Sequence, residues 1–199
     1  IKWKKGSNKI VIFLRSRNKY PASLLSGTNT ENYLKYCHHL NNFFNNVSTK
    51  IKKNFELRFP PNYKLRNKDN NFMNVKDLTY DNKTEMFKKL KSSILAINTT
   101  HSTSFLQIMS INFPNILILN GKDNPLRDKE SFKLLKKVNI FHDNFKSASN
   151  FVNKLDNSEK IFNWWYKADT QRAVKQFCNK HSKINENLIK EIKEIIIKK

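Results

Sequence analysis

The sequence predicts an α/β fold built on a small parallel sheet, and two observations support this. Short apolar runs rich in Ile, Val, Leu and Phe alternate along the chain with longer segments. In the longer segments the apolar residues recur at steps of three and four, which is the period of a helix, whereas the short runs have the length of strands. Such alternation is typical of βα units, which build parallel sheets covered by helices.

Two strands and one long helix are predicted in the first part of the chain. The continuous apolar run at residues 10–14 suits a strand that is buried on both faces. Residues 30–53 have helical periodicity, and Thr30 is a suitable N-cap. A second apolar run at residues 55–59 stops at two prolines and predicts the second strand. Residues 62–82 are polar and rich in Asn, so we expect a long loop there.

Two further strands and the remaining helices follow the same pattern. Strands are expected at residues 94–98 and 116–119, and none is expected from about Phe141 onward. The predicted helices cover residues 84–93, 102–111, 128–137, 145–155, 158–166, 168–181 and 184–198. The result is a Rossmann-like small parallel sheet flanked by helices, with a helical C-terminal appendage. We therefore expect residues 1–142 to form the α/β core and residues 143–199 to form a helical region that packs on it.

The chain carries a formal net charge of +22, from 38 Lys and Arg against 16 Asp and Glu. Such a surface attracts nucleic acid, anionic lipid or phosphorylated ligands. AT-rich codons, which encode Lys, Asn and Ile, are another source of the same composition. Direct base readout depends on bidentate Arg, yet Arg occurs at only six positions and the lysines are spread along the chain. Nucleic acid is therefore a disfavoured partner.

Several classes of site are excluded by the residue pattern. Cys37 and Cys178 do not make a disulfide framework. Adjacent helical residues point about 100° apart, so Cys37, His38 and His39 cannot all face one zinc ion, and we expect no metal. The chain has three Gly and no Gly-rich phosphate-binding fingerprint, which excludes simple nucleotide hydrolases and dehydrogenases. It also has no apolar run of about 20 residues and no secretory signal, so we expect a cytoplasmic protein. We expect no cofactor.

A run of hydroxyl residues lies between the predicted strand at 94–98 and the helix that follows it. We take Thr100, His101, Ser102, Thr103 and Ser104 as candidate binding residues. The free N–H groups and the dipole at a helix start favour an anion, above all phosphate, and the hydroxyl groups add donors. The alternatives are that Ser102 or Thr103 only caps the helix, and that His101 is a plain loop residue rather than an acid, a base or a phosphate donor.

Three arginines follow strands that would end at the same edge of a parallel sheet. Arg15 and Arg17 lie just beyond the first predicted strand, and Arg58 lies at the end of the second. Ligands of open parallel sheets bind beyond the carboxyl ends of the strands. Guanidinium groups placed there could hold a diphosphate in bidentate fashion. For each arginine alone, a solvated surface charge is the alternative.

Motifs are spread along most of the chain, from about residue 9 to residue 182. They are Leu-Arg-Phe-Pro-Pro-Asn-Tyr at 57–63, Thr-His-Ser-Thr-Ser-Phe-Leu-Gln at 100–107, Asn-Phe-Pro at 112–114, Ile-Phe-His-Asp at 140–143, Trp-Trp at 164–165 and Gln-Phe-Cys at 176–178. Together they resemble a family of transferases encoded in bacterial O-antigen and surface-polysaccharide gene clusters. The Trp-Trp pair and the Thr/Ser-Phe-Leu segment are the most specific parts of the resemblance.

The resemblance implies the C-terminal half of a GT-B-type glycosyltransferase, in which the nucleotide-sugar donor binds. The donor phosphates would rest on the helix start at 102–104, assisted by Arg15, Arg17 and Arg58. Family members typically have Glu where this chain has Gln107, which can still bind donor hydroxyls but brings no charge. The resemblance also implies a longer protein with an N-terminal acceptor half. We expect that half and any catalytic base to lie outside these 199 residues, so that this chain alone binds without turnover.

Two other functions stay open. A basic, non-enzymatic RNA- or ribosome-associated protein would bind RNA with a steep salt dependence. The basic amphipathic helix predicted at residues 184–198 could instead lie on an anionic membrane surface such as the inner membrane, or pack on a neighbouring domain. Trp164 and Trp165 likewise have two interpretations, packing between helices or stacking on a sugar.

Overall fold

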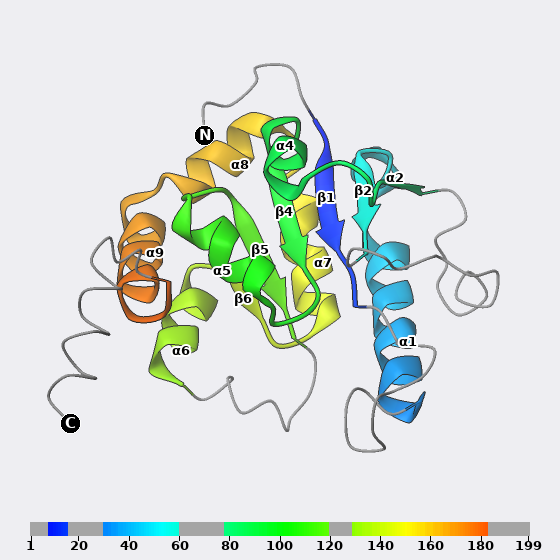
Figure 1. The fold of residues 1–199 in the computed structure, drawn as a ribbon, viewed down its shortest axis with the longest axis horizontal. Helices are drawn as coiled ribbons and strands as arrows, with labels where there is room; N and C mark the ends of the chain where they lie inside the picture. Colours follow the sequence, from blue (N-terminus) through cyan, green and yellow to red (C-terminus); the bar gives the residue numbers. More distant parts are fainter. Residues whose placement is uncertain (1–7, 16–29, 60–77, 120–128, 183–199) are drawn as a thin grey trace, which may run out of the picture.

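The computed structural model describes residues 8–15, 30–59, 78–119 and 129–182, and it confirms the predicted α/β fold (Figure 1). Six strands form one sheet in the order β3-β2-β1-β4-β5-β6, and all neighbouring pairs are parallel. The strands are β1 (Ile10–Phe13), β2 (Phe55–Arg58), β3 (Thr79–Tyr80), β4 (Leu95–Asn98), β5 (Asn115–Ile118) and β6 (Phe141–His142). This is the strand order of the Rossmann fold.

Helices cover both faces of the sheet (Figure 1). They are α1 (Thr30–Asn46), α2 (Thr49–Lys52), α4 (Met86–Lys91), α5 (Thr103–Ser110), α6 (Glu130–Lys137), α7 (Phe145–Lys154), α8 (Ser158–Trp165) and α9 (Ala168–His181). In the described part of the chain, none of them combines the length and the hydropathy that crossing a membrane requires.

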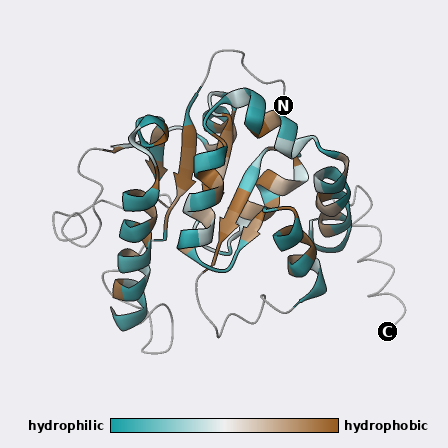
Figure 2. Ribbon diagram, turned by 180° about the vertical axis from the view of Figure 1, so that it is seen from behind, coloured by the Kyte–Doolittle hydropathy of each residue, from teal (hydrophilic) through white to brown (hydrophobic). Residues whose placement is uncertain are grey.

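Successive strand residues face opposite layers of the core. Ile10 and Ile12 of β1 pack in a cluster with α1 and α7, whereas Val11 and Phe13 pack with α4 and α5. A third cluster joins α5, α6 and α9 to Leu117 of β5. Figure 2 shows the result, with hydrophobic strands inside and helices whose outward faces are hydrophilic. Burial on both faces explains why these strands read as continuous apolar runs.

Two short strands correct the sequence prediction. β3 lies inside the segment expected to be a loop, and β6 lies where no further strand was expected. β3 pairs with Glu56 and Leu57 of β2, and β6 pairs with Leu117 and Ile118 of β5. Two residues are too few to show a period of two, so pairing with a distant neighbour is what defines these strands.

The helix predicted at residues 30–53 is divided into α1 and α2. The side chain of Asn153 on α7 fills the break, because its Oδ1 accepts the N–H of Ser48 at 2.9 Å and its Nδ2 donates to the carbonyl of Asn46 at 2.8 Å. These contacts satisfy backbone groups that a helix end leaves without partners. They join residues more than 100 positions apart, which local periodicity does not report.

Asparagine takes the place of glycine at two helix ends. Asn112 (φ 52°) follows α5, and Asn139 (φ 60°) follows α6. The N–H of Asn112 donates to Met109, and the N–H of the next residue donates to Ile108, which is the pattern of a Schellman motif. Asn is one of the few residues other than Gly that enter this left-handed region routinely.

Adjacent tryptophans fix α8 to these two turns. Trp165 is fully buried, and its Nε1 donates to Oδ1 of Asn112 at 3.0 Å. Nε1 of Trp164 donates to the carbonyl of Val138 at 2.8 Å. Both turns come directly before a strand, so the pair lies at the amino edge of the sheet, where Figure 1 shows α8. Of the two roles considered for these tryptophans, packing between helices and stacking on a sugar, these contacts agree with packing.

The helices after residue 142 pack against the sheet and its other helices. Phe145, Ala148 and Val152 of α7 lie in the same core cluster as β1, and α9 packs with α5 and α6. The division into a core at 1–142 and a helical region at 143–199 stays a prediction. The helix expected at residues 184–198 lies outside the described residues.

Candidate functional site

The order of the strands reverses beside β1. The chain runs from β1 outward to β2 and β3, and then crosses back to place β4 on the other side of β1. Phe13, the last residue of β1, lies opposite Asn98, the last residue of β4. In open parallel sheets, ligands bind beyond the carboxyl ends of the strands at such a switch point. Arg15 and residues 99–104 follow these two strands directly, so they belong to this edge.

A buried hydrogen-bond chain joins β1 to β4 at the switch point. Thr99 Oγ1 donates to the carbonyl of Phe13 at 2.8 Å, and the Tyr36 hydroxyl lies 2.7 Å from Thr99 Oγ1. Because the single hydroxyl proton of Thr99 goes to Phe13, Tyr36 must donate to Thr99. The Tyr36 oxygen in turn accepts the backbone N–H of Arg15 at 3.1 Å. α1 thereby fixes the backbone of Arg15 relative to β4.

Burial keeps the Tyr36 hydroxyl protonated. The side chain lies in the core beneath the switch point, and desolvation raises the pKa of Tyr36 to about 12 although its hydrogen bonds act in the opposite direction. The hydroxyl therefore remains a donor to Thr99 throughout the physiological pH range.

Removing this hydroxyl should lower the free energy of unfolding. Tyr36→Phe loses the hydrogen bonds to Arg15 and Thr99, and we expect a loss of about 1–2 kcal/mol in urea unfolding. Tyr80→Phe is the matched control, because Tyr80 is 57% exposed and should change stability by less than about 0.5 kcal/mol. Equal stability of the two variants would contradict the role given to Tyr36.

A second polar chain runs from the start of α5 into the sheet. The hydroxyl oxygens of Ser102 and Ser104 are 2.6 Å apart, and Ser104 donates to Asn98 Oδ1 at 3.2 Å. Asn98 Nδ2 donates to Asn115 Oδ1 at 2.7 Å, and Asn115 Nδ2 donates to the carbonyl of Phe105 at 3.5 Å. Both asparagines are fully buried, and this chain supplies the partners that buried amides need.

Ser102 occupies the N-cap position of α5 without capping it through its side chain. Its backbone is extended (φ −143°, ψ 167°), and its hydroxyl accepts no backbone N–H of the first turn. Asn144 and Asn157 do cap α7 and α8 in this way, at 2.7 and 2.9 Å. The alternative that Ser102 serves as a side-chain cap is therefore wrong, and its hydroxyl bonds to Ser104 instead.

His101 lies between the starts of α5 and α6. Its ring centroid is 6.0 Å from that of Phe132, which is also 6.3 Å from the ring of His181 on α9. Partial burial lowers the pKa of His101, and the charge of Lys129 lowers it further. The imidazole is therefore neutral at pH 7, with one donor and one acceptor nitrogen.

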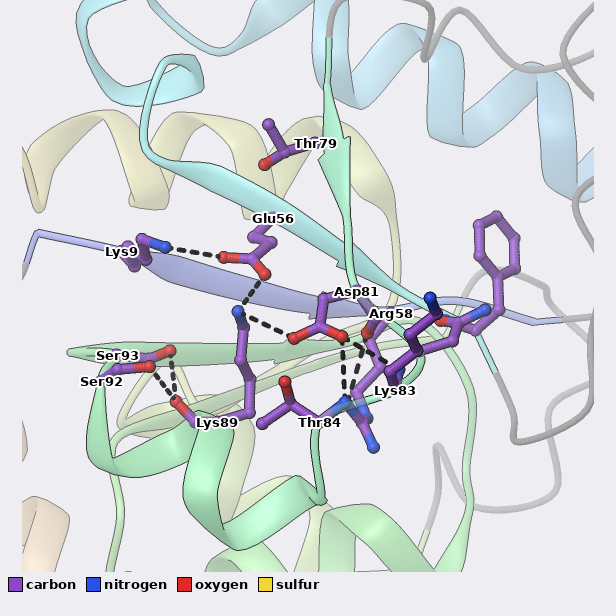
Figure 3. Close-up of polar contacts among 12 residues, drawn as sticks. Lys9, Glu56, Arg58, Thr79, Asp81, Lys83, Thr84, Lys89, Ser92 and Ser93 are labelled. Carbon is purple, nitrogen blue, oxygen red and sulfur yellow. Dashed lines mark hydrogen bonds and ion pairs between the residues drawn. The ribbon is translucent and has the colours of Figure 1, made fainter.

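The predicted arginines differ in their surroundings. Arg15 is exposed and follows β1 at the switch point. Arg58 is buried at the end of β2, where its Nη1 donates to the carbonyl of Asp81 at 3.3 Å (Figure 3). Arg17 lies outside the described residues. Of Arg15 and Arg58, Arg15 is the one whose side chain is open to a ligand from solution.

A buried ion cluster lies beside Arg58 (Figure 3). Glu56 of β2 pairs with Lys89 of α4, and Lys89 Nζ is also 3.3 Å from Asp81 Oδ2. Hydrogen bonds from Thr84, first from its side chain and then from its backbone, hold the pKa of Asp81 well below its usual range. These contacts fix the segment between β3 and α4.

Thr100, Thr103 and Gln107 complete the set predicted from the sequence. Thr100 is half-buried, and Thr103 and Gln107 are exposed. Thr103 and Gln107 are four residues apart on α5, so they share one face of that helix. The structure thus places Arg15 and residues 100–104 at one edge, with Gln107 one turn further along the helix.

Sequence reasoning missed four residues that shape this edge, which are Tyr36, Asn98, Thr99 and Asn115. Asn98 and Asn115 do leave a signal, because an amide inside an apolar strand must find hydrogen-bond partners. Tyr36 leaves none, since helical periodicity marks its position only as buried and does not distinguish tyrosine from phenylalanine there.

Comparison with known proteins gives one family match. The model of a family described as LIC12162 family transferase matches residues 1–196. Among solved structures, the catalytic domain of cholesterol-α-glucosyltransferase from Helicobacter pylori is 15% identical, with a TM-score of 0.45, over 86% of this chain and 95% of that one. No curated protein matches the chain. The family match includes every residue of the carboxyl edge described above.

Proposed function

Because the chain belongs to the LIC12162 family of transferases, we propose that it binds the nucleotide-sugar donor of a glycosyl transfer reaction. The proposed site is the carboxyl edge of β1 and β4. The observation that carries the proposal is that Arg15, His101 and the start of α5 all follow β1 or β4, the two strands on either side of the switch point.

The donor diphosphate lies, in this proposal, at the first turn of α5. Backbone N–H groups and the helix dipole favour an anion there. Arg15 neutralises the phosphates, and the neutral ring of His101 donates one hydrogen bond. Such a site stabilises the charge that develops on the leaving diphosphate. Arg17, Arg58, Thr100, Thr103 and Gln107 are the further donor-binding residues of this proposal.

The motifs that resemble O-antigen and surface-polysaccharide transferases suggest the biological process. In this proposal, the acceptor and the catalytic base are held by an N-terminal half of a longer protein, and the reaction takes place on the cytoplasmic side of the inner membrane. The 199-residue chain then binds donor without catalysing transfer.

A thermal-shift screen of the chain tests the proposal. The ligands are UDP-glucose, GDP-mannose, UDP, GDP and a structured RNA. A nucleotide at about 100 times its Kd stabilises the folded state by about 2.7 kcal/mol, which raises Tm by several degrees.

Arg15→Ala should weaken the binding of that nucleotide at least about tenfold. Arg172→Ala is the control, because Arg172 lies on the exposed side of α9 and pairs with Asp169 at 3.7 Å. A shift with RNA and with no nucleotide would show the RNA-associated function instead.

A further inference from the structure

In the hydrogen-bond chain from Ser102 to the carbonyl of Phe105, each group donates toward the interior of the protein. The Phe105 carbonyl, at the buried end of the chain, determines this orientation. The carbonyl of Phe105 can only accept, so Asn115 presents Nδ2 to it and Oδ1 to Asn98. Asn98 then donates through Nδ2 and turns its Oδ1 toward Ser104. A carboxamide oxygen also can only accept, so Ser104 gives its single proton to Asn98.

The consequence reaches the surface at Ser102. The Ser102 and Ser104 oxygens are 2.6 Å apart, and the proton of Ser104 is already in use, so Ser102 donates inward. Turning the Ser102 proton outward would break this short bond and leave the Ser104 oxygen without a donor. Ser102 is half-buried at the start of α5, so its remaining lone pairs are what it offers to a ligand.

We infer that Ser102 recognises a hydroxyl group of the ligand rather than a phosphate oxygen. A phosphate oxygen is an acceptor and would face another acceptor, whereas a ribose or sugar hydroxyl has a proton to donate. The inference rests on the proposed function and deepens it, because it separates two parts of the site. Backbone N–H groups of α5 and Arg15 serve the phosphates, and the Ser102 oxygen reads a hydroxyl.

Calorimetric titration of the 199-residue chain with five probes tests the inference. The probes are inorganic pyrophosphate, UDP, GDP, UDP-glucose and GDP-mannose. Ser102→Ala should weaken the nucleotide that binds by about fivefold and leave pyrophosphate affinity within about twofold. Ser102→Thr retains the hydroxyl and should restore the affinity. A loss with the free diphosphate identifies a ribose hydroxyl, and a loss with the nucleotide sugar alone identifies a sugar hydroxyl.

Two further variants make the test specific. Ser110→Ala is the matched control at the other end of α5, where the hydroxyl donates to the carbonyl of Gln107 at 2.8 Å. It should leave all affinities unchanged. Ser104→Ala removes the group that holds the Ser102 proton inward, so nucleotide affinity should fall while pyrophosphate affinity stays the same or rises. Thermal unfolding of each variant shows that it is folded.

The outcomes separate this inference from the proposed function. If Ser102→Ala weakens pyrophosphate as much as nucleotide, Ser102 contacts phosphate and the inference is overturned. If the unmodified chain binds nucleotides and Ser102→Ala changes none of the affinities, the inference alone is wrong. If none of the probes binds the unmodified chain, the proposed function is wrong and the inference falls with it.

Discussion

Lys89→Met is expected to lower the free energy of unfolding by about 3 kcal/mol or more. The ammonium group of Lys89 lies between Glu56 and Asp81, and the side chains of Lys89 and Glu56 are 9% and 8% exposed (Figure 3). Without it, the Glu56 carboxylate stays buried with Lys9, which is 3.3 Å away and 58% exposed. A buried charge that loses its buried partner carries most of its desolvation cost uncompensated. Urea unfolding followed by circular dichroism measures the loss.

The neighbouring lysine provides a matched control. Lys88 is 74% exposed, and its Nζ lies 3.9 Å from Glu85, so Lys88→Met should change stability by less than about 0.5 kcal/mol. The double variant Lys89→Met with Glu56→Gln removes both charges and should recover most of the loss. If Lys88→Met and Lys89→Met destabilise the protein equally, the buried cluster is not what holds α4 to β2.

Acidification from pH 7 towards pH 4 should remove about 3 kcal/mol of stability through His142. This residue is buried at the end of β6, where burial lowers its pKa from about 6.5 to about 4. Nε2 lies 3.2 Å from the carbonyl of Asn139 and therefore carries the proton, and Nδ1 accepts from Ser147 at 2.9 Å. Between these two pKa values the unfolded chain binds a proton that the folded protein does not. The stabilisation is therefore complete above pH 6.5 and is lost as the pH falls.

Urea unfolding at a series of pH values tests this dependence. Carboxylates with lowered pKa, such as Asp81 and Asp143, also contribute to the slope, so the comparison with a variant isolates the histidine. In His142→Gln the difference in stability from the unmodified chain should shrink by about 3 kcal/mol between pH 7 and pH 4. His38→Gln, at an exposed position of α1, should keep the full slope. A slope that survives in His142→Gln would assign the acid sensitivity to other groups.

The sequence predicts the layers of the fold because burial shapes its apolar pattern. Residues 10–14 and 94–97 are continuous apolar runs because both faces of β1 and β4 are covered, and that pattern is local. The break after Asn46 and the two-residue strand at Thr79 are not local. The first depends on Asn153 and the second on the edge of β2, so no window of the sequence contains them.

The candidate site also has features that local sequence predicts and features that depend on distant residues. The positions of Arg15 and His101 follow from their places directly after apolar runs, once the strands are known to be parallel. The partners of the hydroxyl groups do not follow, since Ser102 is a suitable N-cap by composition. Its hydroxyl bonds to Ser104 because Asn98 and Asn115, which lie on neighbouring strands, meet beneath α5. That meeting is a property of strand order.

The two tryptophans of α8 anchor that helix at the amino edge of the sheet, whereas the proposed ligand site lies at the carboxyl edge. Their indole groups secure the turns before β5 and β6, at the far side of the sheet from Arg15 and Ser102. Loops beyond the strands can therefore be replaced without touching the anchors that attach α8. In a designed variant, this would let the recognition surface be exchanged as a unit on an unaltered scaffold.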